Sequence, residues 1–366
     1  MICFECRILS KSHRGFLYPL ANQKGVLCLY IQADNNTKRT QVATNAGKVL
    51  VDKDRNGKER PWRAKKLSNV SYYEILEILS FKKAERVSSC GEILEYDVDN
   101  EGNMKLAKAW FCKSSLCPMC NWRKAMKHSE QAKRVVFEAI KRRPTARWLF
   151  LRLSVRNAID GESLDTSLKL MAEGFRRLMM YKKVTKNLIG FMRTTEITVN
   201  QEDGSYNQHM HILLCVKSTY FKDKANYIEQ EEWASLWQKA MKLPYVPNVH
   251  IEAVKDKRIS RKTGKEKDGL IGAIYETAKY AVKDADYLTG NVQNDIEYVR
   301  DLEQGLHRKR LISYGGLLKE IHKELNLEDV EESDLIHTDD EKEIQEKAYS
   351  LVAQWNWKQQ NYFIRE

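Results

Sequence analysis

The spacing of apolar positions along the 366-residue chain predicts helices and strands in alternation beyond about residue 120. Apolar residues recur at three- and four-residue intervals, as on one face of a helix, in four segments. These predicted helices cover residues 123–142, 163–182, 229–241 and 270–282. Arg143-Pro144 directly follows the first of them and is expected to end it.

Between these helices, runs of β-branched and aromatic residues predict four strands. They cover residues 148–155, 190–199, 209–216 and 249–254. A turn that carries Asp203-Gly204 joins the second strand to the third and predicts a hairpin at the centre of the chain. Mixed helices and strands around a central hairpin favour an α+β fold, with a largely antiparallel sheet flanked by helices.

The charge of the chain adds a candidate partner. There are 62 Lys and Arg against 50 Asp and Glu, which gives a net charge of +12. A body this basic suits a polyanion, of which nucleic acid is the commonest, although solvated basic faces are the plain alternative. The excess is uneven, because residues 328–346 hold ten acidic residues and one Lys. This acidic stretch has three interpretations: a solvated segment, a contact for a host helicase, or a shield over a basic groove.

Several classes of protein are not expected. No run of about 18 apolar residues occurs, so no membrane span is predicted. The residues Met1–Cys6 lack the basic-then-apolar pattern of an export signal. Eight Cys in a chain of this length are too sparse for a disulfide scaffold. We therefore expect a cytoplasmic protein with reduced thiols, in which clustered cysteines are candidate metal ligands.

Two histidines on the third predicted strand, His209 and His211, are the first candidate site. Residues i and i+2 of a strand share a face, so the two imidazoles can hold one divalent cation. A two-residue loop at Asp203-Gly204 would set Glu196 opposite His211, on the same face and within about 5.5 Å. Glu196 is thus the predicted third ligand, in a site that suits Mn²⁺ or Mg²⁺. The alternative is a pair of histidines on a solvent-facing strand.

The predicted helix 270–282 carries a second candidate group. Glu276, Tyr280 and Lys283 stand at positions i, i+4 and i+7, which lie along one helix face. A tyrosine hydroxyl needs a polarised phosphate and nearby positive charge to act as a nucleophile. Lys283 could supply that charge and Glu276 could deprotonate a water. An ordinary exposed helix would carry the same residue types.

Four cysteines form a third candidate site. Cys90, Cys112, Cys117 and Cys120 have the spacing C-x21-C-x4-C-x2-C, with Pro118 inside the last pair. Such spacing is typical of structural Zn²⁺ held by four thiolates in a ribbon-like module; a redox CxxC or plain buried thiols are the alternatives. Basic residues after the cluster and on later segments are candidate contacts for DNA phosphates: Arg123, Lys124, Lys127, Arg152, Arg258, Arg261 and Lys262.

Together these motifs resemble the plasmid rolling-circle replication initiators of the HUH endonuclease superfamily. The resemblance runs from about residue 86 to the C-terminus. It is carried by residues 109–123, 148–157, 206–214, 276–284 and 310–316. One departure is that many relatives have His-Pro before the His-x-His pair, whereas Asn207-Gln208 precede it here.

The resemblance implies an HUH-type sheet and a metal-dependent nick at a plasmid origin, in single-stranded or hairpin DNA. Tyr280 would attack the scissile phosphate and leave a 5′-phosphotyrosine and a free 3′-OH. Glu276 would activate water at termination, and Lys283 would stabilise the charge. The implied partners are origin DNA, a host helicase and the replication machinery in the bacterial cytoplasm. The alternatives are a conjugative relaxase or HUH transposase, and a non-catalytic zinc-containing DNA-binding regulator.

Four regions are expected. A basic N-terminal region, residues 1–85, includes residues 38–66 as a flexible tail or DNA-contacting arm. The four-cysteine module covers residues 86–125 and the catalytic domain residues 126–300. A helical C-terminal segment with the acidic stretch covers residues 301–366.

Overall fold

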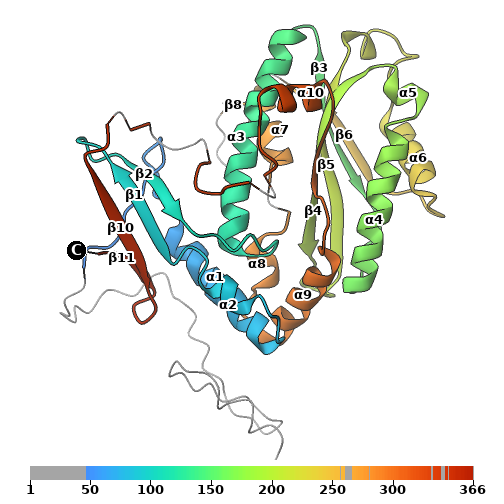
Figure 1. Cartoon of the computed structure of the whole chain (residues 1–366). Helices are drawn as coiled ribbons and strands as arrows, with labels where there is room; N and C mark the ends of the chain where they lie inside the picture. Colours follow the sequence, from blue (N-terminus) through green and yellow to red (C-terminus); the bar gives the residue numbers. More distant parts are fainter. Residues whose placement is uncertain are drawn as a thin grey trace, which may run out of the picture. The chain divides into compact units, whose positions relative to one another are not determined.

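The computed structural model describes residues 47–366 with the exception of 256, 260–265, 280, 331–332, 339–342, 345 and 366. The side chains of residues 257–259 and 266–268 also lie outside the description. The described part is a mixed α+β structure with two larger antiparallel sheets and helices, which confirms the expected fold class at that level (Figure 1).

A five-stranded antiparallel sheet has the order β6-β3-β5-β4-β9. Its strands are β3 (Arg147–Ser154), β4 (Leu188–Val199), β5 (Tyr206–Val216), β6 (Val249–Ala253) and β9 (Ile312–Gly316). The predicted hairpin is its core, because β4 pairs with β5 over nearly their whole length. Both strands are buried along most of their positions, as expected where helices cover both faces of a sheet.

Helices α4 (Gly161–Leu178) and α6 (Gln230–Met241) cover one face of this sheet (Figure 1). The even-numbered strand positions of β5, such as Met210 and Ile212, point into the core beneath them together with Trp233 and Trp237. Asp160 caps α4 by accepting a hydrogen bond from the Ser163 backbone N–H. This cap sets the start of the helix two residues before the predicted one, and the predicted 163–182 helix ends at Leu178.

Helices α3 (Pro118–Arg142), α7 (Gly269–Thr277) and α10 (Leu317–Glu324) cover the other face. Trp148, Phe150 and Leu213 of the sheet pack beneath them. The helix α3 begins five residues before the predicted start, because Pro118 occupies its first turn, where a missing N–H costs nothing. Two of the four predicted zinc ligands, Cys117 and Cys120, therefore lie at the N-terminus of α3.

A second antiparallel sheet has the order β11-β10-β1-β2. Its strands are β1 (Ile93–Val98), β2 (Met104–Ala109), β10 (Tyr349–Asn356) and β11 (Asn361–Ile364). The expectation of a helical C-terminal segment is therefore wrong for β10 and β11. In β10, Ala353 and Trp355 are buried at alternate positions, which is the period of a strand and not of a helix.

The described part of the basic stretch, residues 47–66, is packed and is not a flexible arm. The Leu50 N–H donates to the Tyr362 carbonyl at 3.1 Å, which joins this segment to β11. Trp62 Nε1 donates to Asp52 Oδ2 at 2.7 Å, and both side chains are buried. The stretch ends in α1 (Trp62–Ile78), which is followed by α2 (Ala84–Ser88). Aromatic and acidic partners thus fix a segment whose charge alone predicted mobility.

The remaining elements connect these layers. They are α5 (Lys182–Thr185), η2 (Ser218–Tyr220), β7 (Lys257–Ile259), β8 (Glu266–Asp268), α8 (Asp284–Tyr287) and α9 (Val292–Gly305). Within the described residues, no helix combines the length and the apolar character needed to cross a membrane.

We expect Trp355→Ala to lower the free energy of unfolding by about 3–5 kcal/mol, because a large buried aromatic ring leaves a cavity. Trp355 is 2% exposed and packs against Tyr362 with ring centroids 5.2 Å apart. Tyr349→Ala on the same strand is the matched control, because Tyr349 is 55% exposed; its effect should stay within about 0.5 kcal/mol. Urea unfolding followed by tryptophan fluorescence and circular dichroism measures both. Equal stability of the two variants would show that β10 is not part of the folded core.

Candidate active site and metal centres

The pairing of β4 with β5 determines which side chains meet at the histidine pair. Glu196 lies opposite His209, and Thr194 lies opposite His211. The predicted register, with Glu196 opposite His211, is therefore wrong by two residues. The turn is longer than two residues, because Val199 pairs with Tyr206 and the loop between them is closed by a hydrogen bond from the Asn200 N–H to the Ser205 carbonyl. A shift of two residues keeps every side chain on its face, so Glu196 still joins the histidines.

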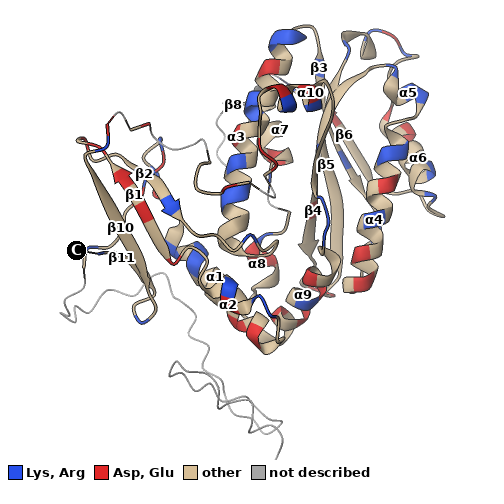
Figure 2. Ribbon diagram, in the orientation of Figure 1, with Lys and Arg blue, Asp and Glu red and all other residues tan. Residues whose placement is uncertain are grey.

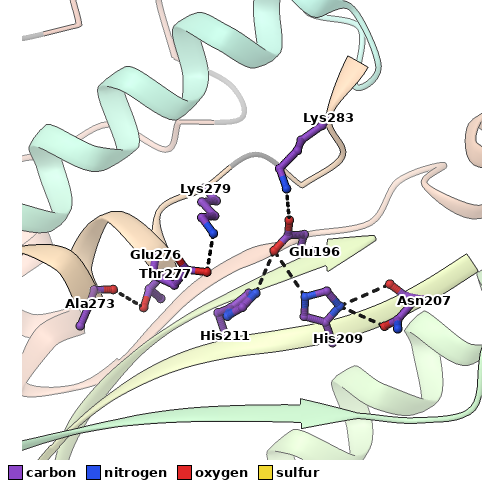
Figure 3. Close-up of polar contacts among 9 residues, drawn as sticks. All are labelled: Glu196, Asn207, His209, His211, Ala273, Glu276, Thr277, Lys279 and Lys283. Atoms are coloured by element: carbon purple, nitrogen blue, oxygen red, sulfur yellow. Dashed lines mark hydrogen bonds and ion pairs between the residues drawn. The ribbon is translucent and has the colours of Figure 1, made fainter. Parts of the chain in front are cut away.

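Glu196, His209 and His211 converge on one point in Figure 3. Glu196 Oε2 lies 2.8 Å from His211 Nε2 and 3.4 Å from His209 Nε2. The exposed fraction of each residue is 5% or less. One ligand atom from each residue lies within 4.8 Å of the others, the arrangement of a possible metal site. The sequence prediction of this trio is confirmed as a cluster in space.

The hydrogen bonding of His209 fixes which ring nitrogen faces the cluster. His209 Nδ1 lies 3.3 Å from the Asn207 carbonyl and 3.2 Å from Asn207 Oδ1, both of which accept hydrogen bonds. This assigns the proton to Nδ1 and leaves the lone pair of Nε2 directed at the Glu196 carboxylate. Two electron-rich groups face each other in this way only when a proton or a cation lies between them. The donor set of this cluster therefore fits a divalent metal ion.

The charge state of the cluster also fits a cation. Burial alone would raise the pKa of Glu196, but its contacts with His209 and His211 and the charge of Lys283 lower it well below the usual range. The carboxylate therefore stays ionised. Burial lowers the pKa of His211 despite the opposing effect of Glu196. At neutral pH His211 is then uncharged, the form in which imidazole binds metals.

The helix that carries Glu276 is shorter than predicted. It ends at Thr277, and Lys283 lies beyond the break as the residue before α8. The prediction of one continuous helix, with Glu276, Tyr280 and Lys283 on one face, is therefore wrong. Neither Gly nor Pro explains the break. Instead, the Ala281 carbonyl accepts a hydrogen bond of 2.7 Å from the Ile197 N–H of β4, at the open edge of the sheet.

This edge contact brings Ala281 and Lys283 to the cluster of Glu196, His209 and His211. Lys283 Nζ lies 3.2 Å from Glu196 Oε1, so the carboxylate has the histidines on one oxygen and a lysine on the other (Figure 3). Burial would lower the pKa of Lys283, but the charge of Glu196 raises it, and the amine stays protonated. Tyr280 lies outside the described residues.

Glu276 stands at the end of α7, on the same side of the sheet as the histidines (Figure 3). Its carboxylate forms an ion pair with Lys279. The negative charge of Glu276 also acts on His211, whose pKa it raises slightly against the dominant effect of burial. Glu276 is 41% exposed at its side chain, so water reaches it. The structure thus brings Glu276 and Lys283 to the cluster from two different elements.

The four predicted cysteines also converge. Cys90, Cys112, Cys117 and Cys120 are all buried and reduced, and their sulfur atoms lie within 4.8 Å of one another. The Cys90–Cys120, Cys112–Cys120 and Cys90–Cys117 sulfur pairs are each 3.6 Å apart. Thiolates around a tetrahedral zinc ion are about 3.8 Å apart, whereas a disulfide needs about 2 Å. The spacing therefore fits a four-thiolate metal site.

A buried lysine beside the cysteines was missed by the sequence reasoning. Lys66 of α1 is fully buried, and its Nζ donates to the carbonyls of Ser88 and Cys90 at 2.6 and 2.8 Å. Burial lowers the pKa of Lys66, and the charge of the cysteines opposes that effect. Asn69 Nδ2, one turn later, donates to Cys117 Sγ at 3.4 Å. No local pattern marked these residues, because Lys66 ends a basic stretch and only the fold brings α1 to the cysteines.

The candidate DNA contacts on α3 have partners inside the protein. Figure 2 shows Lys and Arg at several points along this helix, but Arg123 is 1% exposed and its Nε donates to the Leu335 carbonyl at 2.8 Å. Lys127 pairs with Glu328 at 2.7 Å and donates to the Asp334 carbonyl. The described part of the acidic stretch therefore packs on α3 and is not simply solvated. Arg123 and Lys127 are unavailable to phosphates in this arrangement.

The remaining candidates differ in position. Lys124 is half-buried on α3, and Arg152 lies on β3 opposite His211. Arg258 belongs to β7, but its side chain lies outside the description, and Arg261 and Lys262 lie outside the described residues altogether.

Comparison with known proteins identifies the family. The family model described as "Replication protein" matches residues 103–363. A "Protein rep" of Lactiplantibacillus plantarum is 51% identical over 320 residues, which cover 86% of this chain and 99% of that protein. A "Replication protein" of Staphylococcus aureus is 56% identical over 241 residues, which cover 66% of this chain and 100% of that protein. No solved structure matches the chain. The family resemblance found in the motifs is thus confirmed, and the chain belongs to the family of replication (Rep) proteins.

Proposed function

We propose that this Rep protein is a plasmid rolling-circle replication initiator that nicks one strand of its origin through a covalent tyrosine intermediate. The observation that supports the proposal most strongly is the cluster of Glu196, His209 and His211, with Lys283 on its far side. A buried carboxylate between two imidazoles and an amine is a poor arrangement for a binding module alone, but it suits phosphoryl chemistry. Relaxases and transposases would share this cluster, but the relatives named as replication proteins favour the initiator.

Glu196, His209 and His211 would hold a divalent ion, Mn²⁺ or Mg²⁺, and leave coordination positions open for phosphate oxygens. Bound there, the ion would polarise the scissile phosphate and offset the charge that develops on its oxygens. The role of Asn207 is to orient His209 through Nδ1, in the manner of the outer partners that position metal-binding histidines.

Tyr280 would carry out the strand transfer. Its phenolic oxygen forms a bond to phosphorus while the bond from phosphorus to the 3′ oxygen breaks. The phenolic proton passes to solvent, and the departing 3′ oxygen takes up a proton to become a 3′-OH primer. One phosphodiester is exchanged for another, so no external energy source is needed. Lys283, held at Glu196, places a positive charge beside the reacting phosphate.

Glu276 would serve the last step. After one round of synthesis, a strand end must be released from the protein without a second covalent link. A carboxylate that solvent reaches, close to His211, is in a position to take a proton from an attacking water. This division of roles assigns nucleophilic attack to Tyr280 and hydrolysis to Glu276.

The four-cysteine cluster would hold a structural Zn²⁺ in a ribbon-like module. Four thiolates around Zn²⁺ carry a net negative charge, and the fully buried Lys66 amine compensates part of it. A closed site of this kind stabilises the fold and takes no part in catalysis. Its consequence here is to fix the start of α3, whose first turn contains Cys120.

The central test is a covalent adduct. Incubation with Mn²⁺ and single-stranded origin DNA should give a protein–DNA species that survives denaturing electrophoresis, and Tyr280→Phe should give none. Tyr275→Phe is the matched control, because Tyr275 is a neighbouring tyrosine on α7 with an exposed ring, and it should retain the adduct. An adduct that persists in Tyr280→Phe would refute the assigned nucleophile, and the absence of any adduct or nick would favour a non-catalytic DNA-binding regulator.

Replacing the acidic ligand should separate metal binding from folding. We expect Glu196→Gln to weaken Mn²⁺ binding by about tenfold or more, because a neutral amide replaces a charged ligand. Glu202→Gln, in the turn of the same hairpin and exposed, should leave it unchanged. Titration calorimetry measures both affinities, and equal affinities would rule out Glu196 as a ligand.

The zinc proposal has its own test. Purified protein should contain one zinc per chain by elemental analysis, and Cys117→Ser should lose that zinc and part of its stability. Cys215→Ser provides the control, because Cys215 is buried in the core beneath α3, apart from the four-cysteine cluster. Zinc-free wild-type protein that folds normally would exclude the site.

A further inference from the structure

The face of the five-stranded sheet that carries Glu196, His209 and His211 extends over the neighbouring strands β3 and β6. On β3, Arg152 lies directly opposite His211, and on the other side it lies opposite His250 of β6. Directly opposed residues of antiparallel strands point to the same face. Thr194, His211, Arg152 and His250 therefore form one row across four strands. In this row Arg152 lies between His211 and His250.

The guanidinium group of Arg152 has a buried N–H without a hydrogen-bond acceptor. No hydrogen bond or ion pair joins its side chain to another residue in the described part of the chain, and its Nε is buried without an acceptor. Arg123, by comparison, donates to two carbonyls from its buried position. A guanidinium with a buried, unused N–H has an energetic need for an acceptor, and a phosphate oxygen satisfies it with matching charge and geometry.

The register places Arg152 beside the metal cluster and outside it. Glu196 belongs to the neighbouring row, with His209 and Ser154. It is two strands away from Arg152, a lateral distance of about 10 Å. Lys283 and Ala281 adjoin the opposite side of Glu196, at the edge of β4. Arg152 and Lys283 thus flank the cluster from opposite sides.

We propose that Arg152 binds a phosphate next to the scissile one, so that the DNA strand crosses the sheet from β4 over β3 toward β6. This inference rests on the proposed function, because it assumes that a scissile phosphate occupies the metal cluster. His250, with a side chain 56% exposed, continues the row at the edge strand. Glu252 lies 3.9 Å from His250 on the same edge; it would repel a phosphate, which keeps the strand on the row of Arg152.

A binding experiment with chemically neutralised phosphates tests this directly. The nick site is first mapped by Mn²⁺-dependent cleavage. Oligonucleotides that span it then carry a single uncharged methylphosphonate at each position in turn. Their affinities for wild-type protein and Arg152→Gln are measured in EDTA by fluorescence anisotropy, so that no cleavage occurs. We expect Arg152→Gln to lose about tenfold in affinity for the unmodified strand and to reduce the slope of log affinity against log salt by about 0.7.

The informative result is the coupling between protein and DNA changes. One methylphosphonate, adjacent to the nick, should weaken wild-type binding and have no further effect on Arg152→Gln. Arg152→Lys should recover part of the affinity, because it restores the charge without the planar fork. Arg147→Gln is the matched control, because Arg147 is exposed at the far end of the same strand. Any loss of DNA affinity in this variant should simply add to the loss caused by each methylphosphonate.

Each outcome decides between distinct claims. If the affinity lost in Arg152→Gln adds to the affinity lost with every methylphosphonate, the phosphate contact is refuted. The same holds if Arg152→Gln binds DNA as tightly as wild-type protein does. In both cases the nicking proposal remains intact. Melting curves identify a misfolded Arg152→Gln, and the equally uncharged Arg152→Met then carries the same comparison. Wild-type protein that neither nicks nor binds single-stranded DNA would overturn the proposed function, and this inference with it.

Discussion

The pairing of Glu196 with His209 across the β4–β5 hairpin is the constraint on which the candidate site depends. A slip of one residue would send Glu196 to the opposite face of the sheet, whereas the actual register keeps the carboxylate beside both imidazoles. The same strand supplies the next contact, because β4 beyond Thr194 is no longer paired with β9. The Ile197 N–H of β4 therefore donates a hydrogen bond to the Ala281 carbonyl, and this contact brings Lys283 to Glu196. The strand β4 therefore supplies the Glu196 carboxylate to the cluster and, through its backbone, binds the segment that carries Lys283.

The helix α3 connects this site to the four-cysteine cluster. Its first turn contains Cys120, and its later turns pack on the sheet and on α7, the helix that carries Glu276. The chain after α10 then crosses back over α3, where Arg123 and Lys127 bond to it. It ends as β10 and β11 beside β1. The four cysteines thus lie at the start of the helix that supports the face of the sheet with Glu196, His209 and His211.

Much of the central sheet and of the His-x-His cluster could be predicted, because short stretches of the sequence carry their signals. The β-branched runs located the strands of the central sheet, and the His-x-His spacing required both rings on one face. Three parts could not be predicted in this way. The register depended on a turn whose length is set by hydrogen bonds among Asn200, Asp203 and Ser205. The end of α7 depended on a distant backbone N–H. The burial of Arg123 and Lys66 depended on segments far away in the chain, so their charge alone suggested the wrong surroundings.

We propose that His209 and His211 are ligands of one metal ion, and the coordination of bound Mn²⁺ decides this. Electron spin echo measurements on the Mn²⁺-loaded protein report nitrogen nuclei bonded to the ion. We expect two imidazole nitrogens in the wild-type protein and one in His209→Ala. A Mn²⁺ ion coordinated by oxygen atoms alone would contradict it.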